Sequence, residues 1–543
     1  MNDFCKLFLN IDDGETLTLE KDRIYHVRQD DSVEKRGIYC SNTAKQHENP
    51  DGYRCAAMFL QNKKNITVEG NGATVIVHGK MTPMLFDRCE NITVRNLCFD
   101  YACPTMSEFT VIADEGESFV IKINGDCLFD VEENSILWHG EQSADGTYFW
   151  ADRCNGNRRH IKVFNPETKT TKDFNRNNMV FDRIERIDEN TLRLYPADKS
   201  VKFEEGCVYQ TRNIVRDATG SLFQRCKNLT FDNIRMTFMH GLGMVSQFCE
   251  NVTYLNCDFT PKAGRTVAST ADFFQFSGCK GKITVENCKA GGAHDDYVNV
   301  HGTHLRIVKA DGNSMVVRFM HDESWGFQAF ENGDELEFIR WDTLAPYAQT
   351  KVISFERLND TDIKLVVDKP IPSEAVIGKD VVENAIWTPD LHVSGCEFGP
   401  TSGRGILCTT RGEVVIENNR FDHLWGPALL IEDDCNFWFE SGYTKQIVFR
   451  NNTVTACEFG KTWSDSPVIR YSPKVMNEQS THFVHGKLVV FGNTFEKPYE
   501  GNHSFYLEYL AEAEITDNVF DADYKINAKC VGKVTDSNNL IRK

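Results

Sequence analysis

The sequence predicts an all-β protein, namely a right-handed parallel β-helix that carries two inserted antiparallel, β-barrel-like domains. Two observations support this fold class. Short β-branched strands, each followed by Asn or Gly, recur roughly 20 to 40 residues apart, a spacing typical of stacked solenoids. Two long stretches interrupt this repeat with alternating strands and Gly or Asp turns. The 543 residues therefore divide into rungs at 1–101, 219–302 and 389–543, with insertions at 102–218 and 303–388.

The repeating unit is a short strand that ends in a corner. Residues 251–259 (Asn-Val-Thr-Tyr-Leu-Asn-Cys-Asp-Phe) and 414–421 (Val-Val-Ile-Glu-Asn-Asn-Arg-Phe) are two copies. Asn tolerates the left-handed backbone that a sharp corner needs, and its amide can bond the turns above and below. We therefore expect such corners at equivalent places in successive rungs, namely Asn233, Asn256, Asn287, Gly395, Asn418, Asn451, Gly492 and Asp517.

The two insertions follow a different pattern. We expect strands at 118–123 and 191–195 in the first and at 314–319 and 362–367 in the second, because apolar and polar residues alternate there. Such strands, separated by turns, are typical of small antiparallel barrels. Each insertion could be a structural spacer or a wall of a cleft beside the rungs, and the sequence leaves both interpretations open.

The composition is that of a large soluble protein, with 41% apolar and 26% charged residues. The formal net charge of −19 opposes attraction to nucleic acid or to anionic membranes. No run of about 18 apolar residues predicts a membrane helix. Residues 1–10 are too short and too polar for a secretion signal, which favours the cytoplasm, or a secreted or periplasmic protein whose signal was trimmed. A homo-oligomer remains open.

The 19 cysteines do not suggest a disulfide scaffold in a chain of this length, and several occupy equivalent places in the repeat. We expect most of them to be small buried apolar residues. The spacing of His294, His301 and His304 matches no standard zinc pattern. We therefore expect neither a metal nor a cofactor.

The densest group of chemically active residues surrounds three aspartates. Asp272 lies about one rung before Asp295 and Asp296, so it should lie close beside one of them on the neighbouring turn. Carboxylates so close repel one another, and at least one should hold a proton well above its usual pKa. A protonated carboxyl beside ionised ones is what glycoside hydrolysis needs. A calcium site or a solvated turn is the alternative.

Other residues are candidates for sugar binding. Trp325 and Trp438 could form aromatic plates or belong to the core, and Arg404, between two glycines, could bind a hydroxyl or pair with an acid. His301 could bond the substrate or a catalytic aspartate, or bridge buried polar groups. The complete set of candidate substrate-binding residues is Asn299, His301, Arg265, Trp325, Gln328, Arg404, Glu432, Trp438 and Glu440.

Three segments resemble glycoside hydrolase family 110, the α-1,3-galactosidases. They are the stretch His294-Asp-Asp-Tyr-Val-Asn-Val-His-Gly-Thr-His304 with Asp272 upstream, residues 404–421 (Arg-Gly-Ile-Leu-Cys-Thr-Thr-Arg-Gly-Glu-Val-Val-Ile-Glu-Asn-Asn-Arg-Phe) and residues 438–442 (Trp-Phe-Glu-Ser-Gly). The likeness spans most of the chain, including the insertions. It implies an inverting, metal-independent exo-enzyme that releases terminal α-1,3-linked galactose from blood-group-B-type or linear α-galactosyl glycans. It also implies that Asp272, Asp295 and Asp296 are the catalytic carboxylates and that Asn299 contacts galactose.

Three other functions remain open. The aspartate layout also resembles the pectin-cleaving polygalacturonases of family 28, although Leu305-Arg-Ile-Val308 matches their Arg-Ile-Lys motif only in part. By analogy with them, Asp295 protonates the leaving oxygen while Asp272 and Asp296 hold the attacking water. A β-helix can also be a non-catalytic glycan-binding protein. A polysaccharide lyase would need calcium and a Lys or Arg base, and the rung that carries the aspartates offers no obvious base.

Overall fold

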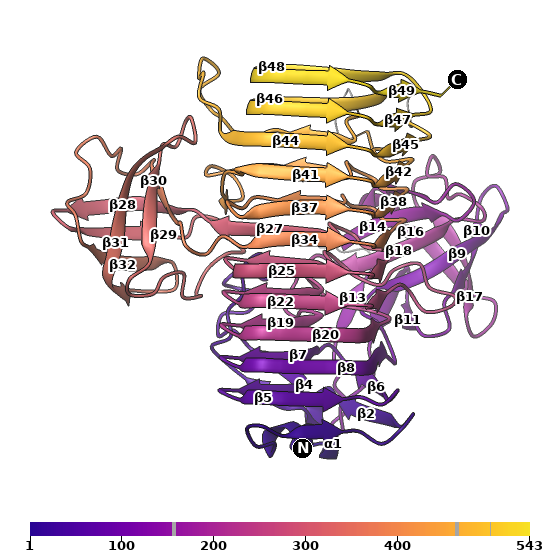
Figure 1. Cartoon of the computed structure of the whole chain (residues 1–543). Helices are drawn as coiled ribbons and strands as arrows, with labels where there is room; N and C mark the ends of the chain where they lie inside the picture. Colours follow the sequence, from indigo (N-terminus) through magenta and orange to yellow (C-terminus); the bar gives the residue numbers. More distant parts are fainter. Residues whose placement is uncertain (155–158, 462–465, 500, 543) are drawn as a thin grey trace.

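The computed structural model is a column of stacked β-strands with two β-rich units beside it (Figure 1), and it confirms the predicted fold class. It describes residues 1–154, 159–461, 466–499 and 501–542. The amino terminus lies at one end of the column and the carboxyl terminus at the other. Because each rung adds one turn to the stack, residues far apart in sequence come together only between neighbouring rungs or through the insertions.

One long face of the column is a ladder of parallel strands in chain order. Strands in the middle of this ladder alternate buried and partly exposed residues, as expected for a sheet with one face toward the core. Its members are β5 (Lys64–Glu69), β8 (Glu90–Tyr101), β20 (Lys227–Met236), β22 (Glu250–Leu255), β25 (Lys280–Glu286), β34 (Asp390–Ser394), β37 (Glu413–Glu417), β41 (Gln446–Arg450), β44 (His485–Phe491), β46 (His503–Thr516) and β48 (Tyr524–Ser537).

A second parallel ladder forms the face that bears the site described below. Its strands are buried on both sides, because the column core covers one side and loops cover the other. They are β4 (Arg54–Gln61), β7 (Thr82–Asp87), β19 (Ser221–Gln224), β21 (Met244–Gln247), β24 (Phe274–Ser277), β27 (Val298–Thr303), β36 (Ile406–Cys408), β39 (Leu429–Ile431) and β43 (Ile469–Tyr471), followed by part of β46.

Short strands complete each turn. A third ladder contains β23 (Asp258–Phe259), β26 (Lys289–Ala290), β35 (Glu397–Phe398), β38 (Arg420–Asp422), β42 (Thr453–Thr455), β45 (Thr494–Glu496), β47 (Val519–Phe520) and β49 (Leu540–Ile541). Near the amino terminus lie β1 (Thr16–Thr18), β2 (Ile24–Arg28), β3 (Val33–Lys35) and β6 (Thr74–His78), and β40 (Glu440–Ser441) pairs with the end of β27.

All eight expected corners adopt the left-handed conformation, with φ between 52° at Asn233 and 67° at Gly492. Bonds between rungs come partly from the residue that follows the corner. In the carboxyl-terminal half this residue is Asn, and the Asn419 side-chain amide donates to Asn452 Oδ1 at 3.0 Å. The same donation continues through Asn493, Asn518 and Asn539. Every buried amide in this ladder therefore has a partner, as a buried polar group requires.

The first insertion is a seven-stranded antiparallel sheet with a small three-stranded sheet beside it, and not a closed barrel. Its strands lie between 107 and 213, and Phe109, Trp138 and Tyr209 stack in its own core. In sheet order the strands are β15 (Thr170–Asp173), β14 (Arg159–Asn165), β18 (Val208–Asn213), β9 (Ser107–Asp114), β10 (Phe119–Ile123), β17 (Thr191–Pro196) and β16 (Phe181–Arg186), with β11 (Leu128–Glu132), β12 (Ser135–His139) and β13 (Ala151–Arg153) in the small sheet.

The second insertion is a closed six-stranded barrel that projects from the side of the column (Figure 1). Its strands lie between 305 and 384, and closure leaves no unpaired sheet edge. In barrel order they are β28 (Leu305–Asp311), β29 (Ser314–Arg318), β32 (Asp362–Val367), β31 (Pro346–Arg357), β30 (Glu335–Ile339) and β33 (Val381–Asn384).

A short helix covers the amino-terminal end of the column, a feature that the strand repeat does not predict. The helix α1 (Asp3–Leu9) begins after Asn2, whose side chain accepts a bond from the Phe4 amide at 3.0 Å. Phe4 and Phe8 are buried in the column core. It is the one α-helix in the part of the chain that the structure describes. Two 3₁₀ turns occur as well, at Gln29–Asp31 and Arg176–Asn178. No described helix is long and apolar enough to cross a bilayer.

Candidate active site

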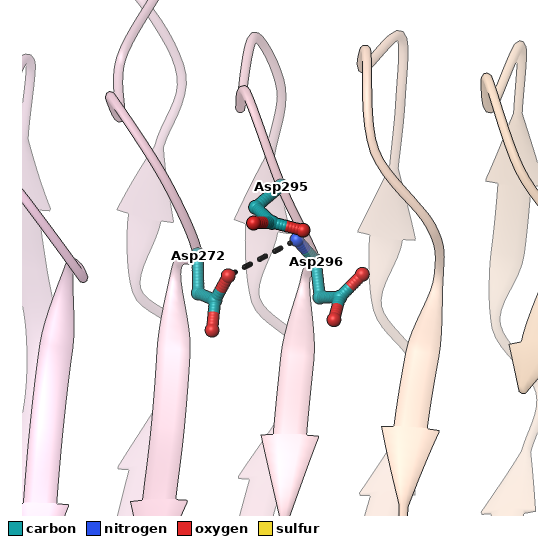
Figure 2. Close-up of side chains that lie close together, drawn as sticks. All are labelled: Asp272, Asp295 and Asp296. Carbon is teal, nitrogen blue, oxygen red and sulfur yellow. Dashed lines mark hydrogen bonds between the residues drawn. The ribbon is translucent and has the colours of Figure 1, made fainter. Parts of the chain in front are cut away.

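The three aspartates lie together on two adjacent rungs (Figure 2). Asp272 stands two residues before β24 and Asp296 two residues before β27, and these strands pair in parallel with Phe274 opposite Val298. The Asp296 amide donates to Asp272 Oδ1 at 3.3 Å. Oxygens of all three carboxyl groups lie within 4.8 Å of one another. The partner of Asp272 on the next rung is therefore Asp296, and the turn brings Asp295 into the same group.

Glycines make this close approach possible. A Cβ at Gly403 would lie 1.9 Å from the Asp295 carbonyl oxygen, so only glycine fits between the two rungs there. A Cβ at Gly243, which has a φ of 47°, would lie 2.4 Å from the Asp272 carbonyl oxygen. The rungs on both sides of the aspartates thus pack backbone against backbone.

Arg404 occupies the equivalent place on the following rung, two residues before β36. Its guanidinium donates to Asp296 Oδ1 at 2.5 Å, to Asp296 Oδ2 at 2.8 Å and to Asp295 Oδ1 at 3.0 Å. Arg216 Nη2, from the end of the first insertion, lies 3.6 Å from Asp295 Oδ2. Both cations therefore favour the ionised form of Asp295.

The three carboxyl groups have different proton affinities. Burial, with the charges of Asp295 and Asp296, raises the pKa of Asp272 well above its usual value. Burial likewise raises the pKa of Asp296 to about 7, although Arg404 opposes the shift. Burial also acts on Asp295, but Arg404 and Arg216 outweigh it and the pKa of Asp295 falls. Near neutral pH the free site therefore holds a proton on Asp272 and a charge on Asp295.

These aspartates form the floor of a pocket. Its walls come from the first insertion, from the turns of later rungs and from a segment near the amino terminus. The lining residues are Asn42, Arg216, Leu242, Asp272, Asp295, Asp296, Asn299, Arg404, Leu407, Glu432, Asp434, Trp438, Glu440 and Lys474.

The amino-terminal wall is the segment 39–44, which we call the strap. The Tyr39 carbonyl oxygen accepts bonds from the side-chain amides of Gln224 and Gln247, on two successive rungs. Asn42 Nδ2 donates to Glu440 Oε1 at 2.5 Å, and Ser324 Oγ donates to Asn42 Oδ1 at 2.7 Å. The strap therefore crosses the face of the column and joins it to the barrel and to Glu440 of β40.

Five of the nine expected sugar-binding residues line this pocket. Asn299 Oδ1 is buried without a hydrogen-bond partner and is free to accept a bond from a bound hydroxyl. Trp438 is 47% exposed, and its ring stacks on His321 of the barrel at 4.3 Å. The five are Asn299, Arg404, Glu432, Trp438 and Glu440. His301 does not line the pocket; it is 3% exposed, and its Nε2 lies 3.3 Å from Gln275 Nε2 and 3.8 Å from Glu440 Oε1.

Trp325 and Gln328 do not reach the pocket. The Trp325 ring is 5% exposed, packs against Tyr39 at 4.9 Å and donates its Nε1–H to the Ala44 carbonyl oxygen at 3.0 Å. It anchors the strap from below and cannot serve as an exposed plate for a sugar. Gln328 lines a separate cavity between the barrel and the first rungs.

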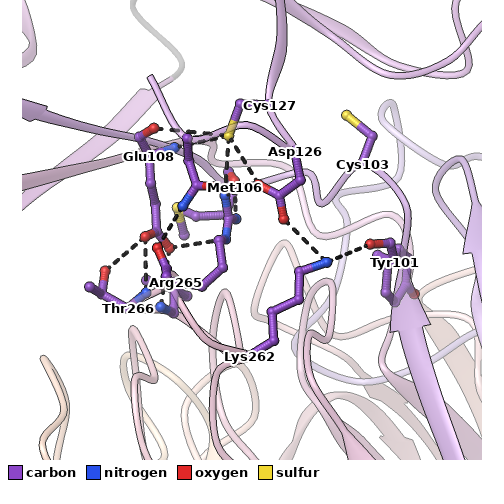
Figure 3. A network of polar contacts seen from close by, with 12 residues as sticks. Tyr101, Cys103, Met106, Glu108, Asp126, Cys127, Lys262, Arg265 and Thr266 are labelled. Carbon is purple, nitrogen blue, oxygen red and sulfur yellow. Dashed lines mark hydrogen bonds and ion pairs between the residues drawn. The ribbon is translucent and has the colours of Figure 1, made fainter. Parts of the chain in front are cut away.

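Arg265 is also remote from the pocket and holds the first insertion to the column (Figure 3). It donates to Asp126 Oδ1 at 3.1 Å, and its Nε lies 3.5 Å from Glu108 Oε1. Glu108 in turn accepts the amides of Thr266 and Val267. The expectation that Arg265 binds substrate is therefore wrong, because its side chain is 2% exposed and consumed by these contacts.

Besides Leu242 and Leu407, four polar pocket residues were not expected from the sequence, namely Asn42, Arg216, Asp434 and Lys474. Each lies outside the repeat copies that carry the aspartates. Lys474 Nζ donates to Glu432 Oε1 at 2.6 Å, and Asp434 accepts the Phe437 amide at 3.0 Å. No local motif marks these positions, since only the folded loops bring them to the site.

The aspartate trio has the donor set of a divalent-cation site, because hard cations prefer carboxylate oxygens. Carboxylate oxygens of Asp295 and Asp296 already accept N–H bonds from Arg404. A cation would therefore compete with the guanidinium for these acceptors. The arrangement suits acid–base chemistry between carboxyl groups of unequal pKa.

Comparisons with known proteins agree with this architecture. Residues 314–382 match the model of a domain described as GLAA-B beta-barrel domain II. Alpha-1,3-galactosidase A of Akkermansia muciniphila is 35% identical over 499 residues, which cover 89% of this chain and 78% of that protein. Alpha-1,3-galactosidase A of Bacteroides fragilis is 33% identical over 89% of this chain and 78% of that protein. Alpha-1,3-galactosidase B of Bacteroides thetaiotaomicron is 30% identical over 89% of this chain and 77% of that protein.

A solved structure, the A-module of the mannuronan C-5 epimerase AlgE4 of Azotobacter vinelandii, aligns with a TM-score of 0.31 and 8% identity over 98% of this chain and 91% of that one. The fold assignment here stands on the strand pairing alone. A parallel β-helix that holds coupled carboxyl groups at the floor of a pocket, together with these relatives, defines the protein as a glycoside hydrolase. The chain belongs to the α-1,3-galactosidase family, glycoside hydrolase family 110.

Proposed function

We propose that the protein removes terminal α-1,3-linked galactose from the non-reducing end of glycans by hydrolysis. The observation that carries the proposal is the coupled trio of Asp272, Asp295 and Asp296 at the floor of a walled pocket. The linkage follows from the names of the relatives. The walls support exo action, because Asn42 of the strap bonds Glu440 of β40 and so closes one side of the pocket.

Exposure suggests how the carboxyl groups divide the work. Asp272 and Asp296 are buried, whereas the Asp295 side chain is 31% exposed and is therefore the most accessible of the three to a leaving sugar. We assign proton donation to Asp295 and the positioning of the attacking water to Asp272 and Asp296. Because Asp295 is ionised in the free site, it has to receive a proton when the sugar binds, and Asp272 is the neighbour that holds one. After this transfer Asp272 is ionised, so it can accept a proton from the attacking water.

We further propose that the reaction inverts the anomeric centre. In most inverting enzymes about 6.5–9.5 Å separates the acid from the base. The nearest oxygens of this trio are closer, within 4.8 Å, so the water would lie at the edge of the group and not between two opposed carboxyl groups. NMR of the galactose that is released first tests this proposal. The β-anomer supports inversion, and the α-anomer contradicts it.

The substrate can be tested directly. The purified protein is incubated with blood-group-B trisaccharide, linear galactosyl-α-1,3-galactose and polygalacturonate, and released sugars are measured. Release of galactose from either α-1,3 substrate supports the proposal, and the ratio of the two rates gives the preference for branched or linear glycans. Cleavage of polygalacturonate alone would contradict it and favour a pectic glycosidase.

A further inference from the structure

The residue before Asp295 belongs to a buried chain of hydrogen bonds that the reaction described above does not use. His294 is 7% exposed, and its Nε2 lies 2.9 Å from Gln210 Oε1 of β18, a strand of the first insertion. Its Nδ1 lies 3.4 Å from Nε of Arg212, on the same strand. Both nitrogens of the imidazole ring therefore bond the first insertion, and His294 does not line the catalytic pocket.

The chain continues beyond Gln210 and ends at a carboxylate, which determines the direction of each bond. Gln210 Nε2 donates to Thr266 Oγ1 at 2.8 Å, and the Thr266 hydroxyl donates to Glu108 Oε2 at 3.0 Å. Because the Gln210 amide group donates at that end, its Oε1 accepts the hydrogen of His294 Nε2. A neutral imidazole then has its lone pair on Nδ1, and Arg212 Nε donates to it. The structure therefore requires the tautomer of His294 with hydrogen on Nε2.

The surroundings of His294 keep its ring neutral. Burial, together with the charges of Arg212 and Lys162, holds the pKa of His294 well below its usual value. A protonated ring would carry a hydrogen on Nδ1 and would lose the bond from Arg212. His294 is therefore unsuited to transfer protons near neutral pH, and its two bonds hold the ring in place.

Asp295 depends on such an anchor more than its neighbour does. The Asp296 carboxylate accepts two bonds from Arg404, at 2.5 Å and 2.8 Å. In the described part of the chain, the Asp295 carboxylate accepts one hydrogen bond, from Arg404 at 3.0 Å, and Arg216 lies 3.6 Å away. The backbone turn therefore has a larger part in placing Asp295. His294 is the residue of this turn that is tied to the first insertion.

Arg212 adds a positive charge near the same turn. It is 6% exposed, and its Nη1 donates to the Asn213 carbonyl oxygen at 2.9 Å. Burial and the charge of Arg216 lower the pKa of Arg212 to about 9, and the carboxylate of Asp295 opposes this shift. The imidazole of His294 thus orients a buried cation that acts electrostatically on Asp295.

We propose that His294 is a positioning residue for the proton donor. Through its bonds to Gln210 and Arg212, the first insertion holds the turn so that the Asp295 carboxyl group reaches the leaving oxygen. The inference rests on the proposed function, because that function assigns proton donation to Asp295. It gives the first insertion a part in catalysis beyond that of a wall or a spacer.

The choice of leaving group separates positioning from general damage. In His294→Phe, which keeps a flat ring and removes both bonds, kcat/KM on galactosyl-α-1,3-galactose should fall about tenfold or more, mainly through kcat. On α-galactosyl fluoride, whose leaving group needs little protonation, the fall should be much smaller. An equal fall on both substrates would overturn the proposal, because a ring that only stabilises the fold favours neither leaving group.

His240→Phe is the matched control. His240 lies two rungs before His294 at the equivalent place, since the residues that precede the two histidines belong to one series of bridges between rungs. It is 6% exposed and its Nδ1 lies 2.6 Å from Thr105 Oγ1, but the residue after it is Gly241 and not an aspartate. The ratio of kcat/KM for the two substrates should stay that of the wild type. A change as large as in His294→Phe would contradict the proposal.

The tautomer can be tested without turnover. In nitrogen NMR of the protein with isotope-labelled histidine, the two ring signals that are absent from His294→Phe belong to His294. They should report hydrogen on Nε2 alone from about pH 5 to about pH 8. Hydrogen on Nδ1, or titration in this range, would refute the proposal. If the wild type cleaves neither α-1,3 glycan while the tautomer is as expected, the proposed function fails and the hydrogen-bonded anchor stands.

Discussion

Asp272 is 3% exposed and has no cation within ion-pairing distance in the described part of the chain, whereas Asp295 lies against two guanidinium groups. The chemistry of the site depends on this difference between neighbours. Asp272 is protonated because it is buried beside two other carboxyl groups. Asp295 is ionised because two arginines lie against it.

The buried Asp272 should lower stability at neutral pH. An unfolded aspartate titrates near pH 4, and the pKa of Asp272 is raised by folding, so between these two values the native state binds more protons and the free energy of unfolding falls as pH rises. Asp272→Asn should therefore raise the apparent melting temperature at pH 7 by roughly 1–3 °C and have no such effect below about pH 4. The matched variant Asp295→Asn should lower it at pH 7, since Arg404 and Arg216 lose an anion. The same shift in both variants would contradict this account.

The assignment of the proton donor predicts a selective rescue. Asp295→Asn should lose roughly a hundredfold or more in kcat/KM on galactosyl-α-1,3-galactose, because it cannot protonate the leaving oxygen. On α-galactosyl fluoride, whose leaving group needs little protonation, the loss should be much smaller. Asp272→Asn and Asp296→Asn should lose activity on both substrates in steady-state assays. A rescue at Asp272 or Asp296 instead would reverse the roles.

The aspartate trio could be predicted from the sequence because a solenoid converts spacing along the chain into neighbours in space, and Asp272 and Asp296 are one rung apart. The same reasoning failed for Arg265 and Trp325. Nothing in their local sequence distinguishes an exposed sugar ligand from a buried anchor, because burial is decided by the insertions that pack on them. Arg216 and Lys474 come to the pocket on loops and could not be found by spacing.

At the scale of elements, the strap and the end of the first insertion help to turn an open face of the column into a pocket, and the second insertion holds the strap through Ser324. Asn42 is central to this, since its side chain joins Glu440 to Ser324 and its backbone is left-handed with a φ of 58°. Glycine is the only substitution that removes the side chain without straining such a backbone.

Asn42→Gly should therefore keep the fold and open the pocket wall. We expect kcat/KM on galactosyl-α-1,3-galactose to fall about tenfold or more, mainly through KM, because the wall no longer holds Glu440 in place. Asn65→Gly is the control, as Asn65 has a φ of 56° in β5 and does not line the pocket. Equal kinetics for the two variants would show that the strap does not shape the site.

The junction of the first insertion depends on Arg265. Arg265→Met would leave Glu108 buried without its cation, and breaking a buried pair costs about 3–5 kcal/mol. We expect a clearly lower midpoint in chemical unfolding. Arg193→Met, which breaks a surface ion pair with Glu115 in the same insertion, should leave the midpoint close to that of the wild type. A loss of sugar affinity at unchanged stability would instead restore Arg265 as a ligand residue.

At the scale of the whole molecule, the fold class could be predicted because corner residues repeat, and all eight expected corners are left-handed. The sequence could not predict that the second insertion closes into a barrel while the first remains an open sheet. The alternation of apolar and polar residues determines which face of a strand is buried, but it does not determine which strands pair at the edges of a sheet. The helix α1 was missed because an end cap occurs once and belongs to no repeat.

All 19 cysteines are free, and only Cys98 and Cys530 are partly exposed. The column is therefore stabilised by packing and by ladders between rungs, without covalent links. Thermal unfolding followed by far-ultraviolet circular dichroism should give the same midpoint with and without a reductant. A reductant-dependent drop of several degrees would indicate a disulfide and contradict the structure.

The strap also determines when during its synthesis the protein can become active. Rungs of a solenoid can stack as they emerge from the ribosome, so the aspartate floor can form early. The wall contact of Asn42 is with Glu440, which follows 398 residues later. At about 5–20 residues per second this interval lasts about 20–80 s. A nascent or truncated chain that ends before Glu440 can therefore carry all three aspartates on stacked rungs and still lack the contact that joins the strap to the opposite wall of the pocket.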